Sequence, residues 1–211
     1  MKTSIVIPCY NHYDLLHQLL WDLYKHCRDS IDEVVVVDDA STEDIQKGLL
    51  GFWFKQGLLP LKVITNKENL GFLKTSNRGM EKASGDILIL ISTDVRIYNS
   101  FVIDRIKEIY SDSPDDILLG NRYISFDTGW NKFDRIYPYL EGWFIVCSKN
   151  TWNELGGFDE RYAPNDYEDI DLSTLAIEKG LRIESLESSD IAHIGAQTYG
   201  YNPERSNHKD K

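Results

Sequence analysis

Residues 85–96 read GDILILISTDVR, and the stretch contains an unbroken run of five aliphatic residues, Ile87–Ile91. Such a run predicts a strand that is buried on both faces, as in a parallel sheet. The run leads into Ser92-Thr93-Asp94, so a carboxylate stands where the chain leaves the core. A buried strand gains nothing from a charged group at its end. Asp94 is therefore a candidate for a ligand site.

The N-terminal half alternates β-branched runs with amphipathic helical patterns. Together with the strand at Asp86–Ser92, the predicted strands are Ser4–Pro8, Glu33–Asp39 and Leu61–Thr65. The predicted helices are Tyr13–His26, a helix from about Glu43 capped by Ser41 or Thr42, and a helix from Asn69 to about Ala83. This alternation predicts an α/β fold, with a Rossmann-like, mostly parallel central sheet flanked by helices.

The C-terminal half is less regular and predicts a smaller part of mixed strand direction. Its predicted strands are Ile117–Ile124, Gly142–Ser148, Arg182–Leu186 and Ile191–Ile194, and its predicted helices are Asn150–Leu155 and Tyr167–Lys179. We expect a single domain over residues 1–198, with 1–98 and 99–198 as its two halves. Residues 199–211 are polar and contain proline, which predicts a loose tail or a linker.

Composition excludes several classes of protein. The formal net charge of −11 over 211 residues argues against a nucleic-acid-binding protein, because such proteins cluster Lys and Arg. No apolar stretch approaches the ~18 residues of a transmembrane helix, and MKTSIVIPCYNHYDLL lacks the features of a signal peptide. Cys9, Cys27 and Cys147 are odd in number and far apart, which predicts buried thiols in a reducing compartment. We therefore expect a cytoplasmic location.

Three of the predicted parallel strands end in polar groups. They deliver Pro8-Cys9-Tyr10-Asn11, Asp38-Asp39-Ala40-Ser41 and Ser92-Thr93-Asp94. Parallel strands place their carboxyl ends along one edge of the sheet, where ligands bind. Each group alone is also explained by a turn, by helix capping or, for Tyr10, by core packing. The combination of three favours a binding crevice.

Several nucleotide-binding motifs are missing from the sequence. No GxGxxG follows the first strand and no GxxxxGK[ST] occurs, which argues against Rossmann dehydrogenases and P-loop NTPases. VVVVDDAS resembles the first strand of haloacid-dehalogenase-like phosphatases, but their second Asp comes two residues after the first. Response-regulator receivers carry an acidic pair after their first strand, whereas here the pair follows the second.

A second acidic cluster lies in the C-terminal half, in GGFDERYAPNDYEDIDLS. Asp166 suits a helix N-cap, and acidic residues in a first helical turn complement the helix dipole. Glu168, Asp169 and Asp171 together exceed what capping needs, and their mutual repulsion should raise at least one pKa. A carboxylate with a raised pKa is a suitable general base for a hydroxyl. His193 is a structural residue unless it meets Asp94 across a metal ion.

Seven motifs in order give the chain a resemblance to a known family. VIPCYN, VVVVDDAS, NLGFLKTSNRG, ILILISTDV, ELGGFDERY, YEDIDL and AHIG resemble the motifs of family 2 glycosyltransferases, which have the GT-A fold. The resemblance extends to about Thr198. It implies an inverting transferase that uses a nucleotide-diphosphate sugar and a divalent metal, Mn²⁺ or Mg²⁺. Residues 1–98 would then bind the nucleotide sugar, and residues 99–198 would hold the acceptor and the catalytic base.

The resemblance also implies roles for individual residues. Asp94 and His193 would bind the metal, Asp169 would be the catalytic base, and Glu168 would contact the acceptor. The implied donor site consists of Pro8, Tyr10, Asn11, Asp38, Asp39, Asn69, Gly71, Lys74, Asn77 and Thr93.

Three positions depart from the family pattern. Ser92 replaces the first Asp of the DxD motif, so metal binding depends on fewer carboxylates. Ser76 replaces an Arg before the Asn of the NLGF motif, which leaves Lys74 or Arg78 as candidate phosphate contacts, and Leu175 replaces a later Arg. A sugar-1-phosphate nucleotidyltransferase is the nearest enzymatic rival, but its Gly- and Arg-rich loop is missing.

The sequence thus predicts a metal-dependent inverting hexosyltransferase. Tyr10 and Asp39 suggest a pyrimidine, so a UDP-sugar is the expected donor and a dTDP-sugar is the alternative. A hydroxyl of a glycan is the expected acceptor. The chain would suit one module of a longer polypeptide. The alternative is a non-catalytic nucleotide-sugar- or carbohydrate-binding module of a larger protein.

Overall fold

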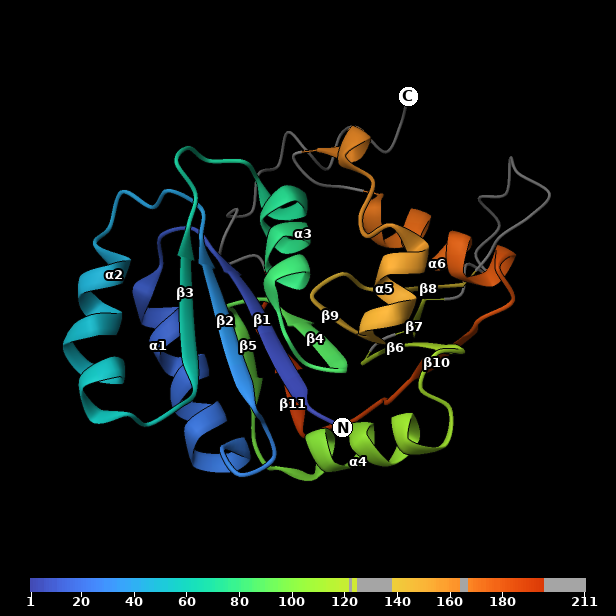
Figure 1. Ribbon diagram of the computed structural model, residues 1–211, viewed down its shortest axis with the longest axis horizontal. Helices are drawn as coiled ribbons and strands as arrows, with labels where there is room; N and C mark the ends of the chain where they lie inside the picture. Colours follow the sequence, from blue (N-terminus) through green and yellow to red (C-terminus); the bar gives the residue numbers. More distant parts are fainter. Residues whose placement is uncertain (122, 125–137, 164–166, 196–211) are drawn as a thin grey trace.

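The computed structural model describes residues 1–121, 123–124, 138–163 and 167–195. Its centre is a seven-stranded sheet with the strand order β10-β6-β9-β4-β1-β2-β3 (Figure 1). The strands are β1 Thr3–Cys9, β2 Glu33–Asp38, β3 Leu61–Thr65, β4 Ile87–Ile91, β6 Ile117–Gly120, β9 Phe144–Ser148 and β10 Arg182–Ser185. The predicted α/β class is confirmed.

The pairing brings the predicted polar groups to one edge of the sheet. β1 pairs in parallel with β2, where Cys9 lies opposite Asp38, and with β4, where Val6 lies opposite Leu90. β9 is antiparallel to both of its neighbours, β4 and β6, so the sheet as a whole is mixed. The carboxyl ends of β1, β2 and β4 therefore meet at the same edge, as the sequence predicts.

Helices cover both faces of the sheet and make three layers. One face carries α1 Tyr13–Asp22, α2 Ile45–Gly48 and α4 Phe101–Asp112, and the other carries α3 Phe72–Lys82, α5 Lys149–Leu155 and α6 Glu168–Glu178. Wider π-helical turns continue α1 over Leu23–Cys27 (η1) and α2 over Leu49–Phe54 (η2). A short 3₁₀ turn, η3, covers Glu160–Tyr162.

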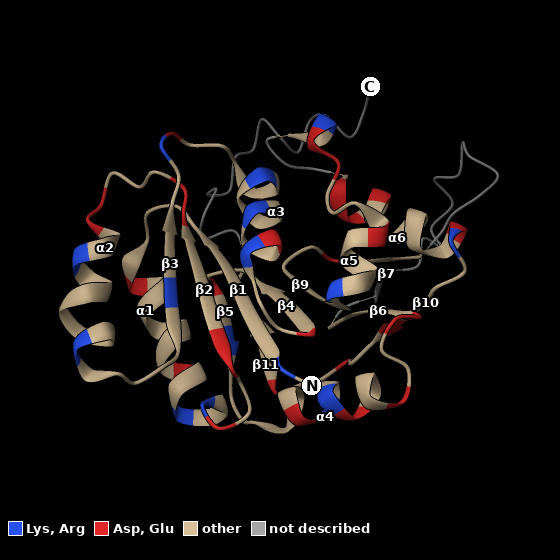
Figure 2. Cartoon of the chain, in the orientation of Figure 1, with Lys and Arg blue, Asp and Glu red and all other residues tan. Residues whose placement is uncertain are grey.

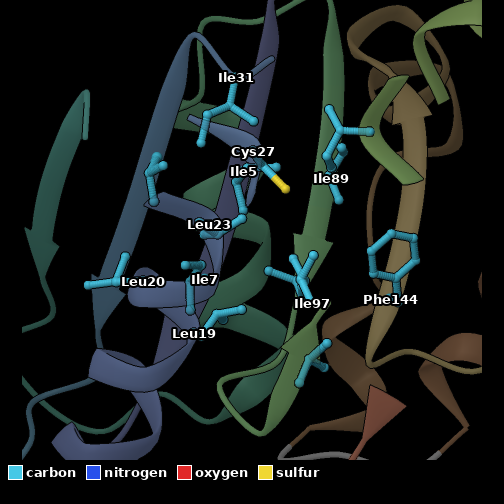
Figure 3. Packing of buried hydrophobic residues seen from close by; sticks show 14 of the residues in the cluster. Ile5, Ile7, Leu19, Leu20, Leu23, Cys27, Ile31, Ile89, Ile97 and Phe144 are labelled. Carbon is cyan, nitrogen blue, oxygen red and sulfur yellow. The ribbon is translucent and has the colours of Figure 1, made fainter. Parts of the chain in front are cut away.

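Side-chain alternation along each strand divides the core into two parts. Ile5 and Ile7 point into the layer under α1 and α4, where they join Ile89, while Val6 points toward α3. Figure 3 shows Ile5 and Ile7 among the leucines of α1, such as Leu19. Complete burial of an aliphatic side chain contributes about 1.5–3 kcal/mol, so these two layers hold the strand ends in fixed positions.

Two small ladders lie outside the main sheet. β5 (Val95–Ile97) follows β4 directly and pairs antiparallel with β11 (Ile191–His193), with His193 opposite Val95. β7 (Tyr123–Ile124) pairs with β8 (Tyr139–Leu140). The first ladder brings the late histidine next to Asp94, although the two residues are far apart in the sequence.

Three expectations from the sequence are wrong in detail. The helix after β2 begins at Ile45, and Asp44 is its N-cap, accepting from Lys47 N at 2.9 Å, because Ser41 Oγ is engaged by Asn11 N. The single strand predicted over 117–124 is two strands, β6 and β7, which belong to different sheets. The third is the stretch Phe101–Asp112, for which no helix was predicted and which forms α4.

Other expectations concern termini, cysteines and membrane spans. Asp166 and the predicted tail 199–211 lie outside the described residues, and α6 begins after Tyr167, whose backbone is left-handed with φ 73°. The three cysteines are buried and free, as predicted. Among the helices of the described residues, none has both the length and the apolar character needed to cross a bilayer.

Candidate functional site

Asp94 and His193 form one corner of the candidate site. Asp94 follows β4 and is 4% exposed, and its Oδ1 lies 3.2 Å from Nε2 of His193. The backbone fixes this approach, because Ile194 N donates to Asp94 O at 2.9 Å beside the β5–β11 ladder. The predicted pair is therefore brought together by strand pairing.

Trp143 packs directly against this corner. Its ring stacks on the His193 ring with the centroids 4.9 Å apart and the planes 11° from parallel. Its Nε1 donates to Glu141 Oε2 at 2.7 Å, and its carbonyl accepts from Ser92 N at 3.0 Å. Sequence reasoning missed both Glu141 and Trp143, because neither belongs to a recognisable motif.

Asp169 lies on the other side of the same segment, in the first turn of α6. Its Oδ2 accepts from Gly142 N at 3.2 Å, and its Oδ1 accepts from Ile170 N at 2.8 Å. Burial raises the pKa of Asp169, and the charge of Glu141 adds to the rise, while the two backbone hydrogen bonds oppose it. Glu168, its neighbour, is 8% exposed. A raised pKa moves Asp169 toward the range of a general base.

The segment Glu141–Trp143 therefore joins two groups that are far apart in the sequence. Asp94 connects through His193 and the Trp143 ring to Glu141, and Gly142 bonds to Asp169. Both predicted carboxylates are therefore linked to one three-residue segment, which bonds to Ser92 after β4 and to the first turn of α6.

The Asp94–His193 pair suits two adjacent ligands of one metal ion. Ligands about 2.1 Å from an octahedral cation lie about 3.0 Å apart when they are neighbours, and the observed separation of Oδ1 and Nε2 is 3.2 Å. Carboxylate oxygen and imidazole nitrogen are both ligands that Mn²⁺ accepts. The described residues contain no group of three or more His, Cys, Asp or Glu placed for a metal. The described residues thus supply two candidate metal ligands, Asp94 and His193, and the remaining coordination positions would be filled by oxygens of the substrate or of water.

The carboxylate of Asp39, which is 3% exposed, holds the loop before α3. Its Oδ1 accepts from Asn66 Nδ2 at 2.6 Å and from Leu70 N at 2.8 Å, and its Oδ2 accepts from Gly71 N at 2.9 Å. Gly71 N also donates to Asn69 Oδ1 at 3.1 Å. Of the predicted donor-site residues, Asp39, Asn69 and Gly71 thus lie together in one hydrogen-bonded loop.

Asn11 joins the loops that follow β1 and β2. Its side-chain oxygen accepts from Thr42 N at 2.8 Å and from Glu43 N at 3.2 Å, and its own N–H donates to Ser41 Oγ. The Glu43 carboxylate in turn accepts from the N–H groups of His12 and Tyr13 at the start of α1. Asn11 thus holds the loop after β1 against the loop after β2.

Other predicted donor-site residues lie at the carboxyl ends of β1, β2 and β4. Asp38 is buried and accepts from Ser41 N at 3.0 Å, Pro8 and Thr93 are buried, and Tyr10 is 37% exposed. Tyr10 is therefore the member of this group with an accessible ring face.

The residues predicted on α3 contact the C-terminal half. Asn77 donates from Nδ2 to Phe158 O at 2.8 Å and accepts at Oδ1 from Phe158 N at 2.9 Å. Its side chain thus pairs with both backbone groups of Phe158, as a neighbouring strand does. Lys74 Nζ lies 3.8 Å from Glu160, and Arg78 donates to Thr65 O and Asn66 Oδ1. These contacts fix α3 between the two halves of the chain.

The comparison with protein families assigns the chain. A model of glycosyl transferase family 2 matches residues 4–169, which include Asp94 and Asp169 and end before His193. The chain belongs to glycosyltransferase family 2. The family assignment confirms the resemblance that the seven motifs predict.

Relatives and solved structures agree with this assignment. The chain is 30% identical over 128 residues to a dolichol-phosphate mannosyltransferase of Pyrococcus furiosus, and 34% identical over 107 residues to the uncharacterized glycosyltransferase YfnE of Bacillus subtilis. These matches cover 59% and 51% of this chain, but 34% and 26% of the relatives. The chain thus corresponds to about a third or less of their lengths.

Solved glycosyltransferases share the fold at low identity. The mannosyltransferase PcManGT from Pyrobaculum calidifontis, in complex with GDP-Man and Mn²⁺, superposes with a TM-score of 0.70 at 19% identity, covering 87% of this chain and 54% of that one. GalNAc-T7 with UDP, GalNAc and Mn²⁺ gives a TM-score of 0.71 at 16% identity, covering 87% and 42%. The fold of this family 2 glycosyltransferase is therefore the GT-A fold.

Proposed function

We propose that this chain is the catalytic domain of a metal-dependent, inverting hexosyltransferase. It would transfer a sugar from a nucleotide-diphosphate sugar, a UDP-sugar in our assignment, to a hydroxyl of a glycan acceptor. The observation that carries the proposal is the connection of Asp94 and His193, through Trp143 and Glu141, to Asp169. It supports one site that serves both the leaving group and the nucleophile.

Asp169 is the base of this proposal. An inverting displacement needs a carboxylate that takes the proton of the acceptor hydroxyl as it attacks the anomeric carbon from the face opposite the leaving group. Burial raises the pKa of Asp169, so its carboxylate is a stronger base toward the acceptor hydroxyl near neutral pH. The hydrogen bonds from Gly142 and Ile170 fix the direction of the carboxylate. Glu168, next to it in the first turn of α6, would contact the acceptor.

Asp94 and His193 are the residues that would hold the divalent metal. When bound, the ion would neutralise the charge that develops on the departing diphosphate, in a chain whose 34 acidic residues outnumber its 23 Lys and Arg. The Trp143 stack fixes the plane of the His193 ring, so that Nε2 keeps facing Asp94. Pro8, Tyr10, Asp38 and the Asp39 loop would form the base and ribose side of the donor site.

Ligands in neighbouring structures support the choice of metal, and those of TarS and GalNAc-T7 support a UDP-sugar, whereas PcManGT holds GDP-Man. Residues 1–349 of S. aureus TarS have been solved with UDP and with UDP-GlcNAc, with TM-scores of 0.63 and 0.60. PcManGT and GalNAc-T7 were each solved with Mn²⁺. UDP and Mn²⁺ are accordingly the first ligands to test.

A thermal-shift screen of nucleotide sugars, with and without Mn²⁺, tests the donor and the metal together. We expect a UDP-sugar to raise the melting temperature only when the metal is present. The anomeric configuration of the product, measured by NMR, tests inversion. Retention of configuration, or stabilisation by a nucleotide sugar that is indifferent to the metal, would contradict the proposal.

The second candidate is a non-catalytic binding module. One family relative is named an inactive polypeptide N-acetylgalactosaminyltransferase-like protein 5, from Macaca fascicularis, and is 20% identical over 232 residues. Ser92 in place of a metal-binding Asp also favours this candidate. Hydrolysis of the donor in the presence of metal, without acceptor, separates the two, because only an enzyme releases the nucleoside diphosphate.

A further inference from the structure

An apolar surface lies on α1 and the α2–η2 helix, away from the candidate site. It consists of Trp21, Leu50, Phe52 and Phe54, which are 37%, 57%, 36% and 41% exposed. In the sequence KGLLGFWFK, Lys47–Lys55, two lysines enclose an apolar run that contributes three of these side chains. Most side chains of this size are buried in soluble proteins, and the Trp21 and Phe52 rings lie 5.9 Å apart, so these exposed side chains on two adjacent helical segments mark an interaction surface.

The exposed rings rest on a rigid base of aromatic side chains. Trp53 is fully buried, and its ring lies 5.5 Å from Trp21 and 5.3 Å from Phe52, in edge-to-face contacts. Trp53 Nε1 also donates to His17 Nδ1 at 3.2 Å. Trp21 and Phe52 are therefore held by a packed cluster, and Leu50 and Phe54 are exposed on the same η2 segment as Phe52, so a partner could bind them without unfolding the helix.

The charge of this segment is opposite to that of the whole protein. From Ile45 to Lys67 the chain has four lysines and no acidic residue, whereas the full chain has 34 acidic residues and a net charge of −11. Figure 2 shows lysine or arginine on α2, at the left of the molecule, and Lys47 and Lys55 flank the apolar run. Lys62 of β3, in contrast, is paired with Glu33 and donates to Lys82 O at the end of α3. Glu43 and Asp44, just before the helix, are engaged in capping α1 and α2. A negatively charged partner would match this side.

We propose that the apolar surface docks on an anionic lipid bilayer. Exposed Trp and Phe beside lysines are the side chains that favour the boundary between lipid headgroups and acyl chains. α2 and η2 together run only from Ile45 to Phe54, a length that suits a helix lying in the interface and not one crossing it. Figure 1 places α2 at the opposite end of the molecule from α6, so docking would leave the site around Asp169 open.

Vesicle co-sedimentation tests the proposal without any assay of sugar transfer. We expect the protein to bind vesicles of phosphatidylcholine with phosphatidylglycerol, and to bind pure phosphatidylcholine much less. Replacing Leu50→Ser and Phe54→Ser together should lower the apparent affinity about tenfold or more. Replacing Lys47→Gln and Lys55→Gln together should lower it about 25-fold, and added salt should do the same.

Phe101→Ser is the matched control, because Phe101 is 72% exposed at the start of α4 and lies outside the apolar surface. It should leave vesicle binding unchanged. Circular dichroism should show all variants folded, since every replaced side chain is exposed. No binding to anionic vesicles, or an equal loss in Phe101→Ser, would overturn the proposal. A self-association that Leu50→Ser and Phe54→Ser abolish, seen by light scattering with no lipid binding, would instead assign the surface to contacts between copies.

Discussion

Replacing Asp39 with asparagine separates two roles of this buried carboxylate. The resemblance to family 2 assigns Asp39 to the donor base or ribose, whereas the structure shows its two oxygens holding the loop before α3. Oδ1 accepts from Asn66 Nδ2 and Leu70 N, and Oδ2 accepts from Gly71 N. In Asp39→Asn the amide oxygen can keep the two bonds at Oδ1. The amide nitrogen then faces Gly71 N–H, donor against donor.

The expected loss of stability follows from these three bonds. A hydrogen bond to a charged group contributes about 1.5–3 kcal/mol and a neutral one about 0.5–1.5 kcal/mol, so the two retained bonds lose about 2 kcal/mol. An unsatisfied Gly71 N–H would add about 1–3 kcal/mol, at the low end because it also donates to Asn69 Oδ1. We therefore expect a total of about 3 kcal/mol, which lowers Tm by roughly 6–12 °C for a chain of this size.

Asp38→Asn is the matched control for this prediction. Asp38 is the adjacent buried acid, and the bond it accepts from Ser41 N at 3.0 Å can be kept by an asparagine oxygen. Its Tm should fall by less than about 4 °C. Both variants are measured by calorimetry without ligand, so that lost donor contacts do not contribute. An Asp39→Asn protein that melts within about 2 °C of the wild type would refute the loop role.

Two further predictions address the base and the core. Glu141→Gln removes a negative charge that raises the pKa of Asp169, so the acidic limb of the pH profile of kcat/KM should move to lower pH. An unchanged or higher limb would contradict that coupling. Gly79→Ala should destabilise the protein by about 1–3 kcal/mol in urea unfolding, because the new Cβ would lie 2.4 Å from Val6 Cγ1. Gly51→Ala, whose Cβ meets nothing within 4 Å, should not lower the free energy of unfolding. An equal destabilisation at both glycines would show that packing is not the cause.

The sequence predicted the parallel part of the fold well, because those strands carry a strong local signal. The apolar runs within Ile87–Ile91 and Glu33–Asp38 predict buried strands, and the polar residues that follow predict where the strands end. The antiparallel position of β9 between β4 and β6 had no local signal, because strand direction is set by packing across the sheet. The omission of α4 was avoidable, since Val102, Ile103, Ile106 and Tyr110 have helical spacing and are buried.

The candidate site was predictable only where residue type reveals chemistry. Asp94, His193 and Asp169 stand in motifs, and the structure links them to the same segment, Glu141–Trp143. Glu141 and Trp143 connect them through a ring stack and an indole hydrogen bond, which depend on how β11 and α6 pack and leave no pattern in the sequence. The loop contacts of Asp39 are to backbone N–H groups, which every residue but proline has, so sequence could not reveal them.

The central question is whether Asp94 serves the donor and its metal while Asp169 serves the transfer step. Calorimetry of donor binding to the Asp94→Ala and Asp169→Asn variants, with and without Mn²⁺, answers it together with single-turnover transfer. We expect Asp94→Ala to lose the metal-dependent part of donor affinity. Asp169→Asn should bind the donor with nearly wild-type affinity and transfer no sugar. Retained turnover in Asp169→Asn, or a metal-dependent affinity unchanged in Asp94→Ala, would contradict the assignment of the base or of the metal corner.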